Sequence, residues 1–435
     1  MGWKETYASK VTTYEEAVKN IKSGDVVTIA HAVGEPVKLV DAMVDYAVAA
    51  DLHDITIHQM VAMGHGKYAQ PGMEKHFNVD PTFLGGATRE VVNSGRGNFT
   101  PCFFYQVPDL WVNEIPSDAL LVTLSTPDAN GFCSFGVSCD YTKPIAECPK
   151  TKVIAVCNPN MPRAMGDNFI HVDDIDVIIE DNDPIIELGL PKIGDTEKKI
   201  GENVATLIHD GDCLQLGIGA IPDAVLTFLD NKKDLGIHSE MISDGVVNLF
   251  EKGVVNCKAK NFNKDKMVIA FLMGTKRLYD FADNNPAVMM MPVDYVNHPV
   301  IIGKNDNMVS VNSCMQVDLQ GQVCSEAMGL KQFSGIGGQI DFIRGAAFSK
   351  GGRAILAFPA TAKGGTISKI VPFLTEGAPV TTSRTDVDYI VTEYGIAKMK
   401  GRNLRERARQ LINVAAPQFR DDLAVEFEKR FAEKF

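Results

Sequence analysis

The stretch Asp210-Gly-Asp-Cys-Leu-Gln-Leu-Gly-Ile-Gly-Ala-Ile-Pro222 carries the pattern that decides the fold. Its Gly-Asp turn leads into a short apolar run, which predicts a buried strand. The strand continues into a glycine-containing loop, and Pro222 marks the start of a helix, because proline is tolerated in the first helical turn. A second strand is expected at Ile237-His-Ser-Glu-Met241. Together these segments predict a strand–loop–helix–strand unit.

The same unit occurs near the start of the chain. Ser23-Gly-Asp-Val-Val-Thr-Ile-Ala-His-Ala-Val-Gly-Glu-Pro36 is followed by a helical pattern and then by Ile57-His-Gln-Met60. Two matching units predict two similar α/β domains with an active-site cleft between them, since clefts between domains are common ligand sites. The second copy has Glu240 where the first has only Gln59, so the chemistry is expected in the second half of the chain.

Apolar β-branched runs alternate with amphipathic helical stretches along nearly the whole chain, which predicts an α/β fold with mainly parallel sheets. Pro191, Gly194 and a run of charges interrupt this pattern, so we expect domains at residues 1–192 and 193–435. Strands are predicted at Val26–Ala30, Ile55–His58, Ala119–Leu124, Val153–Val156, Val177–Ile179, Cys213–Leu216, Met267–Phe271, Ala354–Phe358 and Tyr389–Thr392. Helices are predicted at Tyr14–Ile21, Val37–Val48, Glu197–His209, Asp223–Leu229 and Leu404–Asn413.

The composition excludes several classes of partner. The 435 residues carry a formal net charge of −12, which disfavours nucleic acid and anionic membranes. The nine cysteines form no CxxC pair and the histidines no HExxH pair, so neither a disulfide framework nor a metal site is expected. The polar N-terminus and the lack of a run of about 20 apolar residues predict a cytoplasmic protein.

The loop Gly217-Ile-Gly-Ala-Ile221 and Glu240 form the first candidate site. Glycines let backbone N–H groups approach a ligand closely, and a helix N-terminus favours negative charge. Three interpretations fit this spacing: a catalytic glutamate beside an oxyanion loop, a dinucleotide site with an acidic residue about 20 positions on, and a structural turn with a solvated glutamate. Pro222 stands where a dinucleotide loop has its third glycine, which weakens the second interpretation.

Two further features are weaker. Gly335-Ile-Gly-Gly-Gln-Ile-Asp-Phe342 is suited either to close backbone approach or to a tight structural turn. His31 lies in the loop of the first copy, where a substrate-facing position and a structural histidine are both open.

At these residues the sequence resembles the acetyl-CoA hydrolase/transferase family of CoA-transferases. The likeness rests on Gly217–Pro222, Gly236-Ile-His-Ser-Glu-Met-Ile-Ser-Asp-Gly-Val246, Gly335–Phe342 and Val380–Gly395, in this order. Within the family, Phe271–Phe281 is most similar to 4-hydroxybutyrate CoA-transferases, and butyryl-CoA:acetate CoA-transferases are similar too.

The resemblance implies a ping-pong transfer of CoA through a thioester on Glu240. CoA would move between a short-chain acyl-CoA, which is acetyl-CoA or butyryl-CoA, and the carboxylic acid 4-hydroxybutyrate. It implies an oxyanion loop at Gly217, Ile218, Gly219, Ala220 and Ile221, and a pantetheine arm passing Gly335, Gly337 and Gly338, with Met315 and Lys363 as further CoA-lining positions. CoA is then a substrate, no cofactor is bound permanently, and a homodimer is expected. The alternatives are an acyl-CoA hydrolase, a butyryl-CoA:acetate CoA-transferase and an NAD-dependent oxidoreductase.

Overall fold

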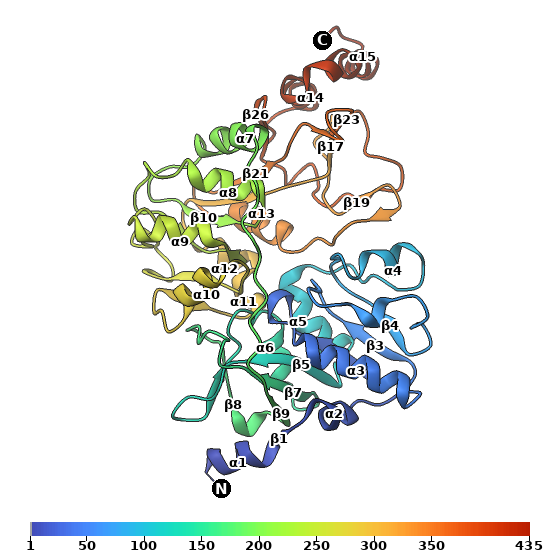
Figure 1. Ribbon diagram of the computed structural model, residues 1–435. Coiled ribbons are helices and arrows are strands. Elements are labelled where there is room, and N and C mark those ends of the chain that lie inside the picture. Colours follow the sequence, from blue (N-terminus) through green and yellow to red (C-terminus); the bar gives the residue numbers. More distant parts are fainter. Residues whose placement is uncertain (1) are drawn as a thin grey trace. The chain divides into compact units, whose positions relative to one another are not determined.

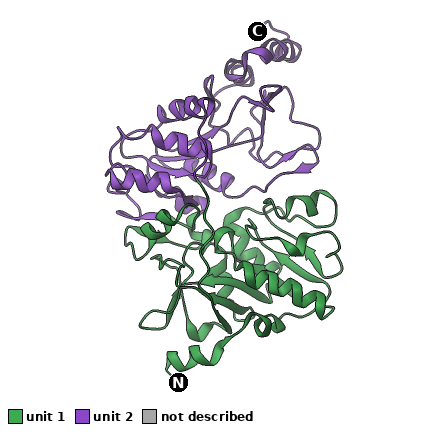
Figure 2. Cartoon of the chain, viewed as in Figure 1, with its two compact units in different colours: residues 1–189, 268–296 green, residues 190–267, 297–435 purple. Residues whose placement is uncertain are grey.

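A computed structural model describes residues 2–435 of the chain (Figure 1). The chain divides into two compact units (Figure 2). Unit 1 comprises residues 1–189 and 268–296, and unit 2 comprises residues 190–267 and 297–435.

Unit 1 contains a seven-stranded parallel sheet with the order β1-β9-β7-β5-β2-β3-β4. All six residues of its strand Ala119–Leu124 are buried, as expected for a parallel strand covered on both faces. The strands are β1 Val11–Thr12, β2 Val26–Ile29, β3 Ile55–His58, β4 Phe77–Val79, β5 Ala119–Leu124, β7 Lys152–Cys157 and β9 Val177–Glu180. The α-helices are α1 Trp3–Lys10, α2 Tyr14–Ala17, α3 Val37–Ala49, α4 Arg89–Asn93, α5 Val107–Asp109, α6 Thr142–Ala146, α10 Lys276–Ala282 and α11 Val293–Val296.

Unit 2 contains a six-stranded sheet with the order β11-β10-β16-β21-β25-β26, parallel except for its last pair. The strands are β10 Cys213–Leu216, β11 Gly236–Ile237, β16 Met308–Asn312, β21 Arg353–Ala357, β25 Tyr389–Thr392 and β26 Gly395–Lys398. The α-helices are α7 Asp195–Ala205, α8 Ala220–Thr227, α9 Asp244–Glu251, α12 Pro299–Ile302, α13 Gln339–Phe348, α14 Leu404–Val414 and α15 Arg420–Phe431.

Short elements complete both units. The small strands are β6 Phe132–Ser134, β8 Phe169–His171, β12 Met241–Ile242, β13 Met267–Ile269, β14 Phe271–Leu272, β15 Val288–Met290, β17 Gln316–Asp318, β18 Val323–Cys324, β19 Ala327–Met328, β20 Lys331–Gln332, β22 Thr361–Ala362, β23 Ile367–Ser368 and β24 Ile370–Val371. The 3₁₀ and π turns are η1 Val18–Asn20, η2 Ala32–Gly34, η3 Lys67–Ala69, η4 Phe104–Gln106, η5 Leu110–Glu114, η6 Val172–Asp174 and η7 Pro417–Phe419.

Five strands follow the same order in both sheets, β3-β2-β5-β7-β9 in unit 1 and β11-β10-β16-β21-β25 in unit 2. The mainly parallel sheets with helices confirm the α/β fold class. In unit 1 the strand before the loop, β2, lies between β3 and β5, and in unit 2 its counterpart β10 lies between β11 and β16. The chain therefore reverses its direction across the sheet at β2 and at β10. Loops at the carboxyl ends of such strands are the usual ligand sites of open α/β sheets.

The segment Val268–Val296 belongs to unit 1, so the compact units differ here from the expected ranges 1–192 and 193–435. Backbone hydrogen bonds explain this: Leu272 N–H donates to Val137 at 2.8 Å, and Met290 N–H donates to Met165 at 2.8 Å. The predicted single strand Met267–Phe271 is divided at Ala270 into β13 and β14, because these two short strands lie in different two-stranded sheets.

Candidate active site

The loop from Gly217 to Ile221 follows β10 and leads into α8. Gly219 has φ +113° and ψ 178°, a conformation that side chains rarely adopt, and it caps the helix. A Cβ atom built at Gly217 or at Gly219 would meet no described heavy atom within 4 Å. Ile218 is 41% exposed. The loop therefore presents open backbone that a ligand can approach.

Glu240 lies between β11 and β12 and is half-buried. Its Oε2 accepts a hydrogen bond from Nδ2 of Asn297 at 2.9 Å. A Cβ atom at Gly338 would overlap Oε2 of Glu240, so the carboxylate lies directly against the glycine backbone. The fold thus brings together Glu240, Asn297 and Gly338 from three segments of unit 2 that are distant in sequence.

Two hydroxyl groups fix the segment that carries Glu240. Ser239 Oγ donates to the carbonyl oxygen of Leu216 at 3.2 Å, which joins this segment to the residue just before Gly217. Ser243 Oγ donates to Oδ1 of Asp223 at 2.9 Å. Burial raises the pKa of the Asp223 carboxyl group, and the nearby Asp244 raises it further, while the bond from Ser243 lowers it. The glutamate is therefore held beside the glycine loop by short-range bonds.

The second glycine loop, Gly335–Gly338, lies just before α13. Gly337 has φ +56°, in the left-handed region, which favours glycine there. Gln339, the first residue of α13, donates from Nε2 to Ser325 Oγ at 2.7 Å and to Thr382 Oγ1 at 2.9 Å. Of this loop, Gly338 is the residue that the structure places against Glu240.

The other predicted CoA-lining residues lie at different places in unit 2. Met315 is half-buried just before β17, and its N–H donates to the carbonyl oxygen of Cys324 at 2.9 Å. Lys363 is exposed in the turn between β22 and β23 and has φ +49°.

Sequence reasoning missed Asn297, which is fully buried although it lies in a loop between α11 and α12. Its sequence context is Val296-Asn-His-Pro299. An asparagine before a proline-containing turn is ordinary turn chemistry, so no local signal distinguished it from a surface residue.

Family models match both halves of the chain. The model described as the acetyl-CoA hydrolase/transferase N-terminal domain matches residues 1–188, and the model of the corresponding C-terminal domain matches residues 274–427. The chain belongs to the acetyl-CoA hydrolase/transferase family. It is accordingly an enzyme of the CoA-transferase class.

Relatives in this family align over nearly their whole length. The 4-hydroxybutyrate coenzyme A transferase of Clostridium kluyveri is 60% identical over 99% of this chain and 100% of its own. The butyryl-CoA:acetate CoA-transferase of Anaerostipes caccae is 36% identical over 99% of this chain and 98% of its own. The solved structure of 4-hydroxybutyrate CoA-transferase from Porphyromonas gingivalis has a TM-score of 0.85, 44% identity, and covers 99% of this chain and 100% of its own.

In this family member, the loop of unit 1 that corresponds to the first glycine loop is filled by side chains. Glu35 is 5% exposed, and its Oε2 accepts from Gln59 Nε2 at 3.0 Å, Met63 N at 2.8 Å and Gly64 N at 3.0 Å. Tyr68 donates to Gln59 Oε1 at 2.7 Å. Burial raises the pKa of Glu35, and these hydrogen bonds oppose that shift only in part. The first copy of the repeat thus holds a buried polar network.

His31 is placed in the same loop of unit 1. It is 2% exposed, and its Nδ1 lies 2.9 Å from Oδ2 of the fully buried Asp140. The rings of Phe104 and Phe271 lie edge-on to it, with centroids at 5.6 Å and 4.6 Å. Asp140 therefore holds the imidazole in one orientation within an apolar surround.

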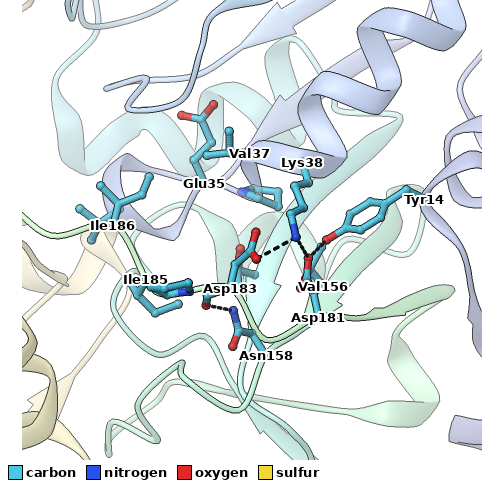
Figure 3. Close-up of a pocket in the computed structure, with 14 residues that line it drawn as sticks. Tyr14, Glu35, Val37, Lys38, Val156, Asn158, Asp181, Asp183, Ile185 and Ile186 are labelled. Atoms are coloured by element: carbon cyan, nitrogen blue, oxygen red, sulfur yellow. Dashed lines mark hydrogen bonds and ion pairs between the residues drawn. The ribbon is translucent and has the colours of Figure 1, made fainter.

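A small cavity of about 70 Å³ lies in unit 1 near the start of α3 (Figure 3). Lys38 Nζ lies 2.9 Å from Asp181 Oδ2 and 2.7 Å from Asp183 Oδ1, and Tyr14 also donates to Asp181. The ammonium group at this cavity is thus already paired with carboxylates.

Every helix within residues 2–435 is too short or too polar to span a bilayer.

Proposed function

We propose that the enzyme moves CoA between a short-chain acyl-CoA and a carboxylic acid, with 4-hydroxybutyrate as the acid, through a thioester on Glu240. The observation that carries this proposal is the half-buried carboxylate of Glu240, bonded to Asn297 and packed against the Gly338 backbone. The 60% identity to a 4-hydroxybutyrate coenzyme A transferase supports the choice of acid.

The proposed reaction needs only a carboxylate nucleophile and donors for an oxyanion. Glu240 attacks the acyl-CoA carbonyl carbon, the C–S bond breaks, and an acyl-glutamyl anhydride and CoA thiolate form. The thiolate then attacks the glutamyl carbonyl, which releases the first acid and leaves CoA on Glu240. The second acid attacks this thioester, and the thiolate then takes the new acyl group from the second anhydride. Atoms balance without ATP or any oxidant.

The glycine loops supply the donors in this proposal. Backbone N–H groups of Gly217, Ile218, Gly219, Ala220 and Ile221 stabilise the oxyanion, and loss of one such donor typically costs about 10²–10³ in rate. The pantetheine arm passes Gly335, Gly337 and Gly338, with Met315 and Lys363 as further CoA contacts. Asn297 donates to Glu240 and so orients the nucleophile.

Covalent labelling tests the proposal. The enzyme is incubated with acetyl-CoA and treated with borohydride, which reduces a glutamyl thioester to an alcohol, and the peptide carrying Glu240 is examined by mass spectrometry. We expect the reduced product on Glu240 alone. Active enzyme without this product, or with a label on another residue, would refute the glutamyl-CoA mechanism.

Two related activities are separated by product analysis. A hydrolase releases free acid and CoA without an acceptor, whereas a transferase requires an acceptor acid for turnover. A butyryl-CoA:acetate CoA-transferase, such as the relative from A. caccae, would give a higher kcat/KM with acetate than with 4-hydroxybutyrate. We propose strict acceptor dependence and a preference for 4-hydroxybutyrate. An NAD-dependent oxidoreductase is not proposed, because the family models match both halves of the chain.

We expect CoA to be a substrate and no cofactor to be bound permanently. We also expect the enzyme to be a homodimer located in the cytoplasm. Light scattering on purified enzyme measures the oligomeric state directly.

A further inference from the structure

The Asn297 amide nitrogen lies between two carboxylates. Its Nδ2 donates to Glu240 Oε2 at 2.9 Å and to Asp341 Oδ2 at 3.3 Å. Asn297 and Asp341 are both fully buried. An amide NH₂ group has two hydrogens, so one is directed to each carboxylate.

The oxygen end of the Asn297 amide lacks such hydrogen bonds. Asn297 Oδ1 is buried and has no hydrogen-bond partner among residues 2–435. A side-chain amide has a donor end and an acceptor end of nearly equal size, and its hydrogen bonds decide which end faces which neighbour. The carboxylates of Glu240 and Asp341 both accept from Nδ2, and these two bonds keep the NH₂ end of the amide facing Glu240.

Asp341 is in a position where it can remain an acceptor. It lies in the first turn of α13, a ten-residue helix capped by Gly338. A carboxyl group keeps an acceptor oxygen in either protonation state, and Oδ2 of Asp341 accepts from Asn297. A reversed Asn297 amide would direct its oxygen at two carboxylates.

We infer that Asp341 is a positioning residue for the nucleophile: it accepts from Asn297 and thereby holds the amide that orients Glu240. This inference rests on the proposed function, because it concerns the same glutamate. Asp341 does not touch the reacting atoms in this scheme. Its proposed effect on Glu240 passes through Asn297.

Three consequences follow for variants. Asp341→Leu removes the acceptor, and we expect single-turnover formation of the Glu240 thioester to slow by about 10- to 100-fold, since small misplacements of a reacting group cost this much. Asp341→Asn retains one acceptor atom but adds a competing donor, so a loss of about 3- to 10-fold is expected. The affinity for free CoA, measured by calorimetry, should stay within about twofold in both, because Asp341 acts on orientation and not on CoA binding.

A double-mutant cycle with Asn297→Ala is the deciding experiment. If Asp341 acts through Asn297, adding Asp341→Leu to Asn297→Ala slows the reaction by less than about twofold further, because the effects of coupled residues do not add. Asp212→Asn is the matched control. Asp212 is also buried in unit 2, but it precedes β10 and pairs with Arg353 at 2.5 Å, so it should change the rate by less than about twofold.

The inference would be overturned if Asp341→Leu formed the thioester at the wild-type rate. It would also be overturned if the rate losses of the Asp341 and Asn297 variants multiplied in the double variant. Melting curves show whether Asp341→Leu folds. If it does not, Asp341→Asn replaces it in the double-mutant cycle with Asn297→Ala. Failure of wild-type enzyme to label on Glu240 would instead reject the proposed mechanism, so the two failures are distinguishable.

Discussion

The loop after β2 in unit 1 and the loop after β10 in unit 2 occupy the same place in the five strands whose order the two sheets share. In unit 1 the Glu35 carboxylate fills the loop with hydrogen bonds to Gln59 and to backbone N–H groups. In unit 2, Gly217 and Gly219 leave the corresponding space open, and Glu240 is half-buried beside it. The comparison teaches that one topology accommodates a loop filled by side chains and a loop with open backbone. The two loops differ in side chains and in backbone, since Ala32 of the unit 1 loop has φ +53° within η2 and Gly219 has φ +113°.

Glu240→Gln should produce the largest effect in this comparison. An amide is a far poorer nucleophile than a carboxylate, so CoA transfer should fall by at least about 10³-fold. Initial rates of CoA exchange with acetyl-CoA and 4-hydroxybutyrate measure it. Glu35→Gln is the matched change in unit 1 and should leave the rate within about threefold. Activity of Glu240→Gln within tenfold of wild type would show that the reactive carboxylate lies elsewhere.

Gly338→Ala should reduce transfer by about 10²-fold, because displacement of a nucleophile by about 1 Å costs this much. Its methyl group would overlap Oε2 of Glu240. Gly64→Ala is the control in unit 1, since its methyl group would overlap Oε1 of Glu35. There the overlap should lower the free energy of unfolding by about 1–3 kcal/mol and spare the rate. Steady-state kinetics and thermal melting of both variants test this contrast. An equal loss of rate in both variants would contradict a catalytic role for Gly338 and a structural role for Gly64.

Gly217→Val should lower kcat/KM by about tenfold and change the free energy of unfolding by less than about 0.5 kcal/mol. The added atoms would enter a space in which no described atom lies within 4 Å of Cβ, so they oppose a ligand and not the fold. Steady-state kinetics and melting curves measure both quantities. A large loss of stability with unchanged kcat/KM would show that the loop is a structural turn.

The smallest effect on activity is expected at His58, which lies after the first copy of the loop and stacks on Trp111 with ring centroids 5.3 Å apart. Its Nε2 lies 3.9 Å from Oδ2 of Asp80, too far for a hydrogen bond, and burial lowers the pKa of His58 to about 4. Between pH 6.5 and 4 the unfolded chain binds a proton that the folded chain does not. Stability should therefore fall by about 3 kcal/mol as the pH decreases through this window.

His58→Phe retains the stacking and removes the titration. The difference between its melting temperatures at pH 7.5 and pH 5 should be smaller than that of the wild type. An unchanged difference would show that other groups cause the acid sensitivity.

Local patterns in the sequence predicted the framework closely. The strands Ile55–His58, Ala119–Leu124, Cys213–Leu216 and Tyr389–Thr392 have the predicted bounds. These strands are short, buried runs flanked by turn residues, so local composition is enough to define them. The glycine loop and Glu240 were found for a similar reason, because the repeat showed that the second copy has Glu240 where the first has Gln59.

The contacts between distant segments were not predictable in this way. Asn297 lies 57 positions from Glu240 along the chain, and Asp341 lies 44 positions from Asn297. Nothing in either segment indicates its partner. The membership of Val268–Val296 in unit 1 was not predictable from the sequence either, since it depends on backbone hydrogen bonds to Val137 and Met165.

The sequence by itself determined the two α/β units, the glycine loop and the carboxylate that differs between them, because hydrophobic periodicity and turn residues act over a few positions. The tertiary structure alone decided which loop is filled, that Gly338 lies against Glu240 and that Asn297 donates to it. These are packing relations among segments far apart in the chain, and only the closed fold brings their atoms within hydrogen-bond distance.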